Sequence, residues 1–281
     1  KVDRPVLTNV VDLIVDGDGQ LALVRRIAAA TAARSARKSE SKPGIPLWCR
    51  RLIVTESAIQ VVDHSVSPRA NLKVAIQRLD VDTQANARRE PGYRAELSIA
   101  NLAKTLSLSG TWSLPNDSKS DFEITARLDA DGVTGGAAAP YLAPLGASSA
   151  LSAGKIGFDL SASTAPVGSR SSRSRLQLRG LEIQDEGRPL LRCELIDVPT
   201  LTADPEARDY SLGAIVVAGV EASLVRRPNG LIEGLGLRSQ DVRNPKPSTM
   251  GRLTVRSISV GLRDVSWQDL QFKGREALRL R

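Results

Sequence analysis

The sequence predicts a mainly β protein built from an antiparallel meander of short strands. Several segments alternate apolar and polar side chains with the two-residue period of a half-buried strand. Those segments are residues 72–76, 95–99, 106–114, 122–128, 156–160 and 176–178. Turn-forming residues separate them, including Pro91-Gly92, Asp131-Gly132, Glu186-Gly187 and Pro199. Short alternating strands between such turns are typical of an antiparallel sheet.

Clean alternation means that one face of the sheet meets water and the other meets apolar matter. A second sheet covers the apolar face in a sandwich, and the sheet covers itself in a barrel. In an open trough, lipid can cover it. The alternation alone leaves these three arrangements open.

Two stretches depart from the strand pattern. Residues 20–38 place Leu21, Val24, Ala28 and Ala32 on one helical face and predict an amphipathic helix near the N-terminus. Its basic side either is solvated while the helix caps the sheet, or contacts lipid headgroups or other anions. The headgroup-contact candidates are Arg25, Arg26, Arg34 and Arg37.

The second departure is a short helix expected around residues 137–145, between prolines, which would cap or cross the trough. The Ser- and Arg-rich residues 163–175 and residues 239–249 are expected to form exposed loops.

Composition narrows the function. Of the 281 residues, 41% are hydrophobic but only 3% are aromatic, which disfavours an aromatic cage or a base-stacking platform. The net charge is +8, and residues 21–52 hold eight basic side chains against Glu40 alone. That local basic surface suits anionic lipid, polyanionic glycan or nucleic acid. We expect no nucleic-acid partner, because stacking aromatics are scarce.

The residue types needed for catalysis are sparse. His64 is the one histidine, and its neighbours Asp63 and Ser65 point to the opposite strand face, so no catalytic relay forms. No metal-ligand spacing and no phosphate-binding glycine loop occurs. We therefore expect no enzyme activity, no metal and no cofactor. Cys49 and Cys193 are interpreted as small buried hydrophobes in preference to a disulfide.

The tail of the chain repeats its head. Residues 11–15 and the turn at Gly19 match residues 222–226 and Gly230, 211 positions later. Arg51-Leu52-Ile53-Val54 matches Arg252-Leu253-Thr254-Val255, 201 positions later, and each strand leads to an aspartate, Asp63 or Asp264. The connection between the two matched strands has therefore changed length by ten residues. Such self-similarity usually indicates stacked units that share one core.

The repeat predicts three parts. Residues 1–45 would end a preceding unit and add the basic helix, residues 46–231 would form one β-groove unit, and residues 232–281 would connect to and begin the next unit. The chain begins at Lys1 rather than Met and ends inside a strand-like run at Arg281, so we interpret it as a piece of a longer protein.

Four motifs resemble the AsmA/TamB-like family of bacterial envelope proteins. They are the turn Arg226-Arg227-Pro228-Asn229-Gly230-Leu231, the strand from Arg51 that ends at Asp63, the segment Ala139-Pro140-Tyr141-Leu142, and the strand start Leu151-Ser152-Ala153-Gly154. The resemblance covers most of residues 6–270. It rests on the residue types found in strands and turns, and not on catalytic residues.

This resemblance implies a long, twisted, open β-groove that conducts phospholipid between the inner and outer membranes, in outer-membrane biogenesis. It implies a periplasmic location, with anchoring to the inner membrane by a segment outside this chain. The expected lining residues are Leu72, Val74, Ile76, Leu97, Ile99, Leu106, Leu108, Trp112, Phe122, Ile124, Leu128, Ile156, Phe158, Leu160, Leu176 and Leu178. The alternative is a structural or adhesive β-sandwich protein of the cell envelope with no ligand.

Overall fold

The structure is a computed structural model of the whole chain. It describes residues 6–7, 10–15, 51–64, 66–83, 91–113, 122–167, 171–204, 209–240, 252–271 and 277–280. The predicted amphipathic helix over residues 20–38, with Arg25, Arg26, Arg34 and Arg37, lies outside these residues, as does Cys49.

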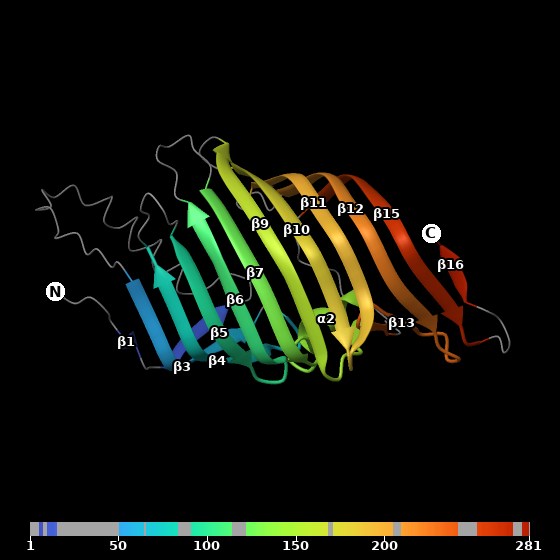
Figure 1. The fold of residues 1–281 in the computed structure, drawn as a ribbon, viewed down its shortest axis with the longest axis horizontal. Helices are drawn as coiled ribbons and strands as arrows, with labels where there is room; N and C mark the ends of the chain where they lie inside the picture. Colours follow the sequence, from blue (N-terminus) through green and yellow to red (C-terminus); the bar gives the residue numbers. More distant parts are fainter. Residues whose placement is uncertain are drawn as a thin grey trace, which may run out of the picture.

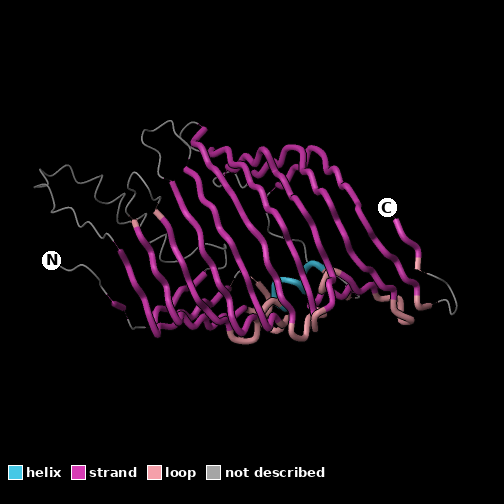
Figure 2. The backbone as a smooth tube through the Cα atoms, in the orientation of Figure 1, coloured by secondary structure: helices cyan, strands magenta, loops and turns pink. Residues whose placement is uncertain are grey.

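All sixteen described strands belong to one sheet. The strands are β1 Val6–Leu7, β2 Val10–Val15, β3 Arg51–Asp63, β4 Ala70–Asp82, β5 Gly92–Ile99, β6 Ala103–Ser113, β7 Phe122–Val133, β8 Ala147–Ser149, β9 Gly154–Val167, β10 Ser171–Asp185, β11 Arg188–Asp204, β12 Asp209–Arg226, β13 Ile232–Gly234, β14 Leu237–Ser239, β15 Arg252–Asp269 and β16 Leu278–Leu280. Helix is confined to α2 Ala139–Leu142 and the 3₁₀ turn η1 Ala143–Leu145 among the described residues (Figure 2).

The sheet is open and mainly antiparallel, which confirms the predicted fold class. Its main strands follow chain order from β3 to β7 and from β9 to β12, each paired antiparallel with the next. They stand side by side along the long axis of the molecule, and the sheet twists and curves along that axis (Figure 1).

Each of the two matched segments found in the sequence contains a pair of parallel strands. β2 pairs parallel with β3, with Val15 opposite Asp63, and β12 pairs parallel with β15, with Arg226 opposite Asp269. The first strand of each pair ends at a matched position, and the second strand begins at Arg51 or Arg252. The division at residues 45 and 231 stays a prediction.

In several strands the alternation of apolar and polar side chains shifts by one residue part of the way along. A residue with positive φ lies at each shift. In β10 the apolar positions shift from Leu176 and Leu178 to Leu181 and Ile183, and Gly180 between them has φ 59°. Its pairing with β9 slips at the same place, as expected of a β-bulge. The bulge keeps both apolar pairs on one face, because a single inserted residue restores the alternation.

The same arrangement recurs in β3 and β12. Glu56 in β3 has φ 50° and separates Val54 from Ile59, while Gly219 in β12 has φ 67° and separates Val217 from Val220. Glycine tolerates this backbone region at little steric cost, whereas Glu56 holds it despite its side chain. The apolar face is therefore continuous along strands of up to 18 residues.

Three local predictions were wrong. Residues 163–167 and 171–175 belong to the paired strands β9 and β10, where Ser163 lies opposite Arg175. Asp131-Gly132 lies within β7. Pro199 lies within β11, where the pairing with β10 slips between Val198 and Leu201; a bulge accommodates the missing N–H donor. The turn at Glu186-Gly187 is confirmed, since both residues have positive φ and join β10 to β11.

Residues 134–153, which we call the strap, connect β7 to its neighbour β9 and include α2, η1 and β8. The strap begins against the β5–β6 turn, where the Thr134 amide donates to the Leu102 carbonyl over 2.8 Å. Further along, β8 pairs with β14 and the Ala150 amide donates to the Gly236 carbonyl over 2.8 Å. The strap thus contains the predicted short helix and joins two distant parts of the sheet (Figure 1).

Candidate functional site

Apolar side chains form a row that runs across the strands. Cross-strand partners point to the same face of a sheet, so the register can be followed from strand to strand. The row consists of Ile76, Leu97, Leu106, Ala130, Ile156, Ile183, Leu191, Ala222 and Val265. At about 4.8 Å between neighbouring strands, its nine strands span about 38 Å.

Two shorter rows lie beside it on the same face. One consists of Val54, Leu79, Ala95, Leu108, Leu128 and Phe158. The other consists of Trp112, Ile124, Ala162, Leu176 and Val198. All the lining residues expected from the sequence lie within β4 to β10, and most of them belong to these rows. Their role in binding stays a prediction.

The apolar face is only half-buried. Among the described residues no large side chain is fully buried. The buried hydrophobic residues are Val54, Ala70, Ile76, Ala95, Ala103, Val133, Cys193 and Val198. Most row members, including Leu106, Leu128 and Phe158, keep intermediate exposure. A closed core would bury side chains of this size, so the sheet leaves apolar surface accessible.

An aromatic pair covers one stretch of this face. The Tyr93 and Trp112 rings stack with centroids 6.0 Å apart, and Tyr93 lies opposite Gly110. The Tyr93 hydroxyl continues past Gly110 and donates to the Thr125 carbonyl over 3.0 Å. A Cβ at Gly110 would lie 2.8 Å from that hydroxyl and 1.9 Å from the Thr125 carbonyl oxygen, so this position requires glycine.

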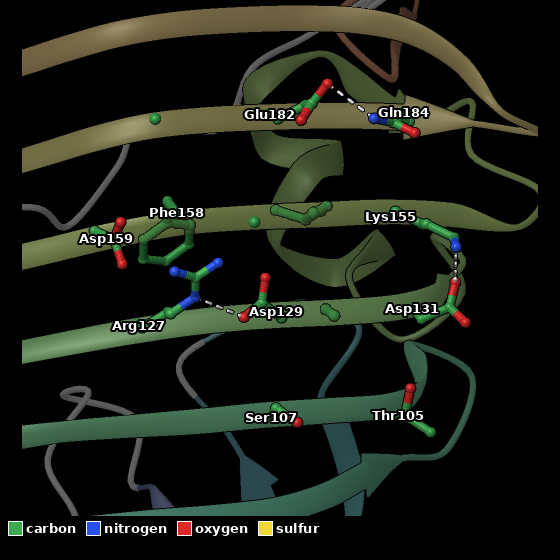
Figure 3. Close-up of a pocket in the computed structure, with 14 residues that line it drawn as sticks. Thr105, Ser107, Arg127, Asp129, Asp131, Lys155, Phe158, Asp159, Glu182 and Gln184 are labelled. Carbon is green, nitrogen blue, oxygen red and sulfur yellow. Dashed lines mark hydrogen bonds and ion pairs between the residues drawn. The ribbon is translucent and has the colours of Figure 1, made fainter.

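Charged side chains occupy the opposite face. In the hollow drawn in Figure 3, the Arg127 guanidinium pairs with Asp129 over 3.1 Å and the Lys155 amine pairs with Asp131 over 3.7 Å. This hollow measures about 400 Å³ and is lined by both signs of charge. These side chains are more than half exposed, so each ion pair contributes little stability.

A larger hollow on the polar side, about 790 Å³, has Arg51, Arg78 and Asp80 among its lining residues. Arg51 binds this carboxylate through two nitrogens, with Nε 2.7 Å from Oδ1, and Arg78 adds a third contact at 3.3 Å. The hydrogen bond from Arg51, helped by Arg78, lowers the pKa of Asp80 below its ordinary value, although partial burial opposes the shift. The cluster ties β3 to β4 on the water-facing side.

A side-chain hydrogen bond joins the strap to the end of β3. The Tyr141 hydroxyl donates to Oδ2 of Asp63 over 2.9 Å, and Asp63 is only 8% exposed. Burial, together with the hydrogen bond and the negative charge of Asp63, raises the pKa of Tyr141 to about 12. The sequence contains both motifs, but the contact spans 78 residues and has no local signal.

At its far end the strap is held by Asp185 in β10. Its carboxylate accepts the Ala153 amide over 2.9 Å, the Ser152 amide over 3.1 Å and the Ser152 hydroxyl over 3.0 Å. Partial burial raises the pKa of Asp185, but the hydrogen bonds from Ala153 and Ser152 lower it by more. The net effect is a pKa below the ordinary value. The strap therefore bridges β3 and the β10–β14 side of the sheet.

Within the described ranges, no group of three or more His, Cys, Asp or Glu side chains is placed to hold a metal ion. Cys193 is a buried free thiol, and His64 is exposed just after β3. Of the helices in the described part of the chain, none has the length and apolar character needed to span a membrane.

The chain matches no protein-family model, and no curated protein or solved structure is significantly similar to it.

Proposed function

We propose that this chain is a segment of an AsmA-like β-groove that binds phospholipid acyl chains and conducts them along its apolar face. The observation that carries the proposal is the apolar row from Ile76 to Val265, which crosses nine strands and is only half-buried. We propose a periplasmic location and a role in passing lipid between the inner and outer membranes.

The energetics favour acyl chains over a ligand with specific polar contacts. Each methylene removed from water contributes about 0.8 kcal/mol, wherever it lies along an apolar row. The row spans about 38 Å, compared with about 30 Å for the hydrocarbon core of a whole bilayer. An acyl chain therefore has several nearly equivalent positions, and the row supports sliding rather than fixed binding.

Photocrosslinking with a phospholipid that carries a photoactivatable group on its acyl chain tests the proposal. We expect crosslinks at β6 and β7 side chains of the apolar face. Leu106→Glu and Leu128→Glu should abolish crosslinking, because each places a charge in the row. Ser107→Glu and Thr125→Glu are matched controls on the exposed polar face of the same strands and should leave crosslinking unchanged.

Circular dichroism and thermal unfolding separate loss of binding from loss of fold. A folded wild-type chain that takes up no lipid, or crosslinks equally on both faces, would contradict the proposal. That result would favour the alternative, a structural or adhesive envelope protein without a ligand.

A further inference from the structure

The strap meets β3 on the apolar face of the sheet. The Tyr141 hydroxyl donates to Asp63, and Asp63 lies opposite Ala70 in β4. From Ala70 to Ile76 the residues of β4 alternate between covered and exposed, and Ile76 belongs to the apolar row. Alternate residues of a strand point to one face, so Ala70 and its partner Asp63 lie on the face of that row.

The strap meets β10 on the same face. Asp185, which binds the last residues of the strap, lies two positions beyond Ile183 of the apolar row. The side chain of Leu151 in the strap lies beside that row, since a Cβ built at Gly236 would be 2.9 Å from Leu151 and 3.5 Å from Ile183. The strap therefore crosses the apolar face between β3 and β10.

The sheet is well covered where the strap crosses it. Ala70 and Val133, at the ends of β4 and β7 nearest the strap, are 2% and 6% exposed. Further into the sheet, Leu128 and Phe158 keep intermediate exposure. The strap therefore closes one end of the apolar face and leaves the rows beyond it accessible.

The middle of the strap is held weakly. Backbone hydrogen bonds to other parts of the chain fix it on either side, at Ala137 and at Gly146. Between them, α2 and η1 contain no buried residue, and Leu145 is 77% exposed. Residues 138–145, which we call the clasp, reach β3 through Tyr141. Segments with few buried contacts open at a lower free energy than the strands around them.

We propose that the clasp opens from β3 when the hydrogen bond between Tyr141 and Asp63 breaks, and that the open clasp admits an acyl chain to the apolar face. Both ends of the strap stay fixed during the opening. The strap suits contact with lipid, because no Asp, Glu, Lys, Arg or His occurs between Asp131 and Lys155, so it closes over an acyl chain without burying a charge. The opening is a property of the chain alone, whereas admission of lipid rests on the proposed function.

Hydrogen exchange of the 281-residue chain tests the opening. The Leu142 and Gly146 amides donate within the strap, and their exchange should hardly change in urea below the unfolding transition, because a local opening exposes little surface. Amides of the β3–β4 pair should exchange faster as urea increases. Tyr141→Phe should speed exchange at the two strap amides about fivefold, the ratio that corresponds to one net hydrogen bond.

Tyr93→Phe is the matched control for hydrogen exchange, because it also removes a hydrogen bond from a tyrosine hydroxyl, here to the Thr125 carbonyl and outside the strap. It should leave exchange at Leu142 and Gly146 unchanged. Thermal unfolding verifies that both variants fold.

Transfer of a fluorescent phospholipid from vesicles to the chain tests admission. Tyr141→Phe should speed uptake up to about fivefold. A bis-maleimide bridge in the variant with His64→Cys and Leu142→Cys should slow uptake about tenfold or more, because it holds the clasp against β3. The two single variants and the wild-type chain, treated with the same reagent, control for the substitutions and for Cys49 and Cys193.

Two results would overturn the inference. One is exchange of the strap amides with the same urea dependence as the β3–β4 pair, since the clasp would then open only with the sheet. The other is equal lipid uptake by the bridged and the wild-type chains. A wild-type chain whose clasp opens but which takes up no lipid would contradict the proposed function and confirm the opening, so the two failures are distinguishable.

Discussion

The Tyr141 hydroxyl lies 2.9 Å from Oδ2 of Asp63 and joins the strap to the end of β3. The other end of the strap pairs with β14 and is held by Asp185 in β10. The strap therefore connects strands that are far apart in the sheet. It restrains the distance between β3 and the strands β10 and β14.

Tyr141→Phe should lower the free energy of unfolding by about 1 kcal/mol, the usual net value of one hydrogen bond. The wild-type chain should also lose stability as pH rises from about 10 toward 12, because the pKa of Tyr141 is about 12 in the folded state and near 10 in the unfolded state. Urea unfolding between pH 7 and pH 12 measures both effects.

Tyr210→Phe is the control for this variant, since Tyr210 on β12 is about as exposed as Tyr141 but lies on a strand away from Asp63. It should leave the free energy of unfolding at pH 7 unchanged. If Tyr141→Phe retained the full alkaline loss of stability seen in the wild type, the contact with Asp63 would not be its cause.

Gly180→Ala should destabilise the chain by about 1 kcal/mol, because alanine is strained at φ 59° even though no atom lies within 4 Å of its Cβ. Gly180→Asn should cost less, since asparagine tolerates this region. Gly219→Ala should cost more than Gly180→Ala, because its Cβ would lie 2.5 Å from the Glu194 side chain. Urea unfolding measures the loss of stability in each variant. Equal losses in all three variants would show that strain at positive φ does not cause them.

Leu235→Asn should raise stability by about 0.5–1 kcal/mol. Leu235 and Gly236 form the two-residue turn between β13 and β14, and Leu235 has φ 58°, which a branched side chain tolerates poorly. Thermal unfolding measures the change. Leu237→Asn, one step into β14, is the control and should give no gain; a gain there would point to reduced surface hydrophobicity as the cause.

Asp80→Asn should lower stability at pH 7 by the modest amount expected of a surface ion pair. Arg51 and Arg78 hold the pKa of Asp80 below its ordinary value, so the carboxylate stabilises the fold above about pH 4, the unfolded pKa. That contribution disappears as pH falls through the folded pKa. The difference between wild type and variant should therefore shrink on acidification; a difference that stayed constant to pH 2 would exclude this origin.

Much of the sheet was readable from the sequence because alternation is a local signal. The shift from Leu178 to Leu181 even marks the bulge at Gly180, since an apolar face can continue only if the chain inserts one residue. Asp131-Gly132 and Pro199 were misread as turns, because residues that favour turns also occupy positive-φ and bulge positions inside long strands.

The candidate site also has features that the sequence predicts and features that it does not. The apolar rows follow from alternation once the register is known, and the register follows from short hairpin connections. The contact between Tyr141 and Asp63 depends on the path of the strap. It is not encoded within a few residues of sequence.

The parallel pairing of β12 with β15 affects the order in which the strands fold. Neighbouring hairpin strands such as β10 and β11 close across two residues, whereas β12 and β15 meet only after the chain has travelled through residues 227–251. Closing that longer loop costs more chain entropy and comes later. We expect the strands from β3 to β12 to form one cooperative unit, with β15 joining last and opening first under native conditions.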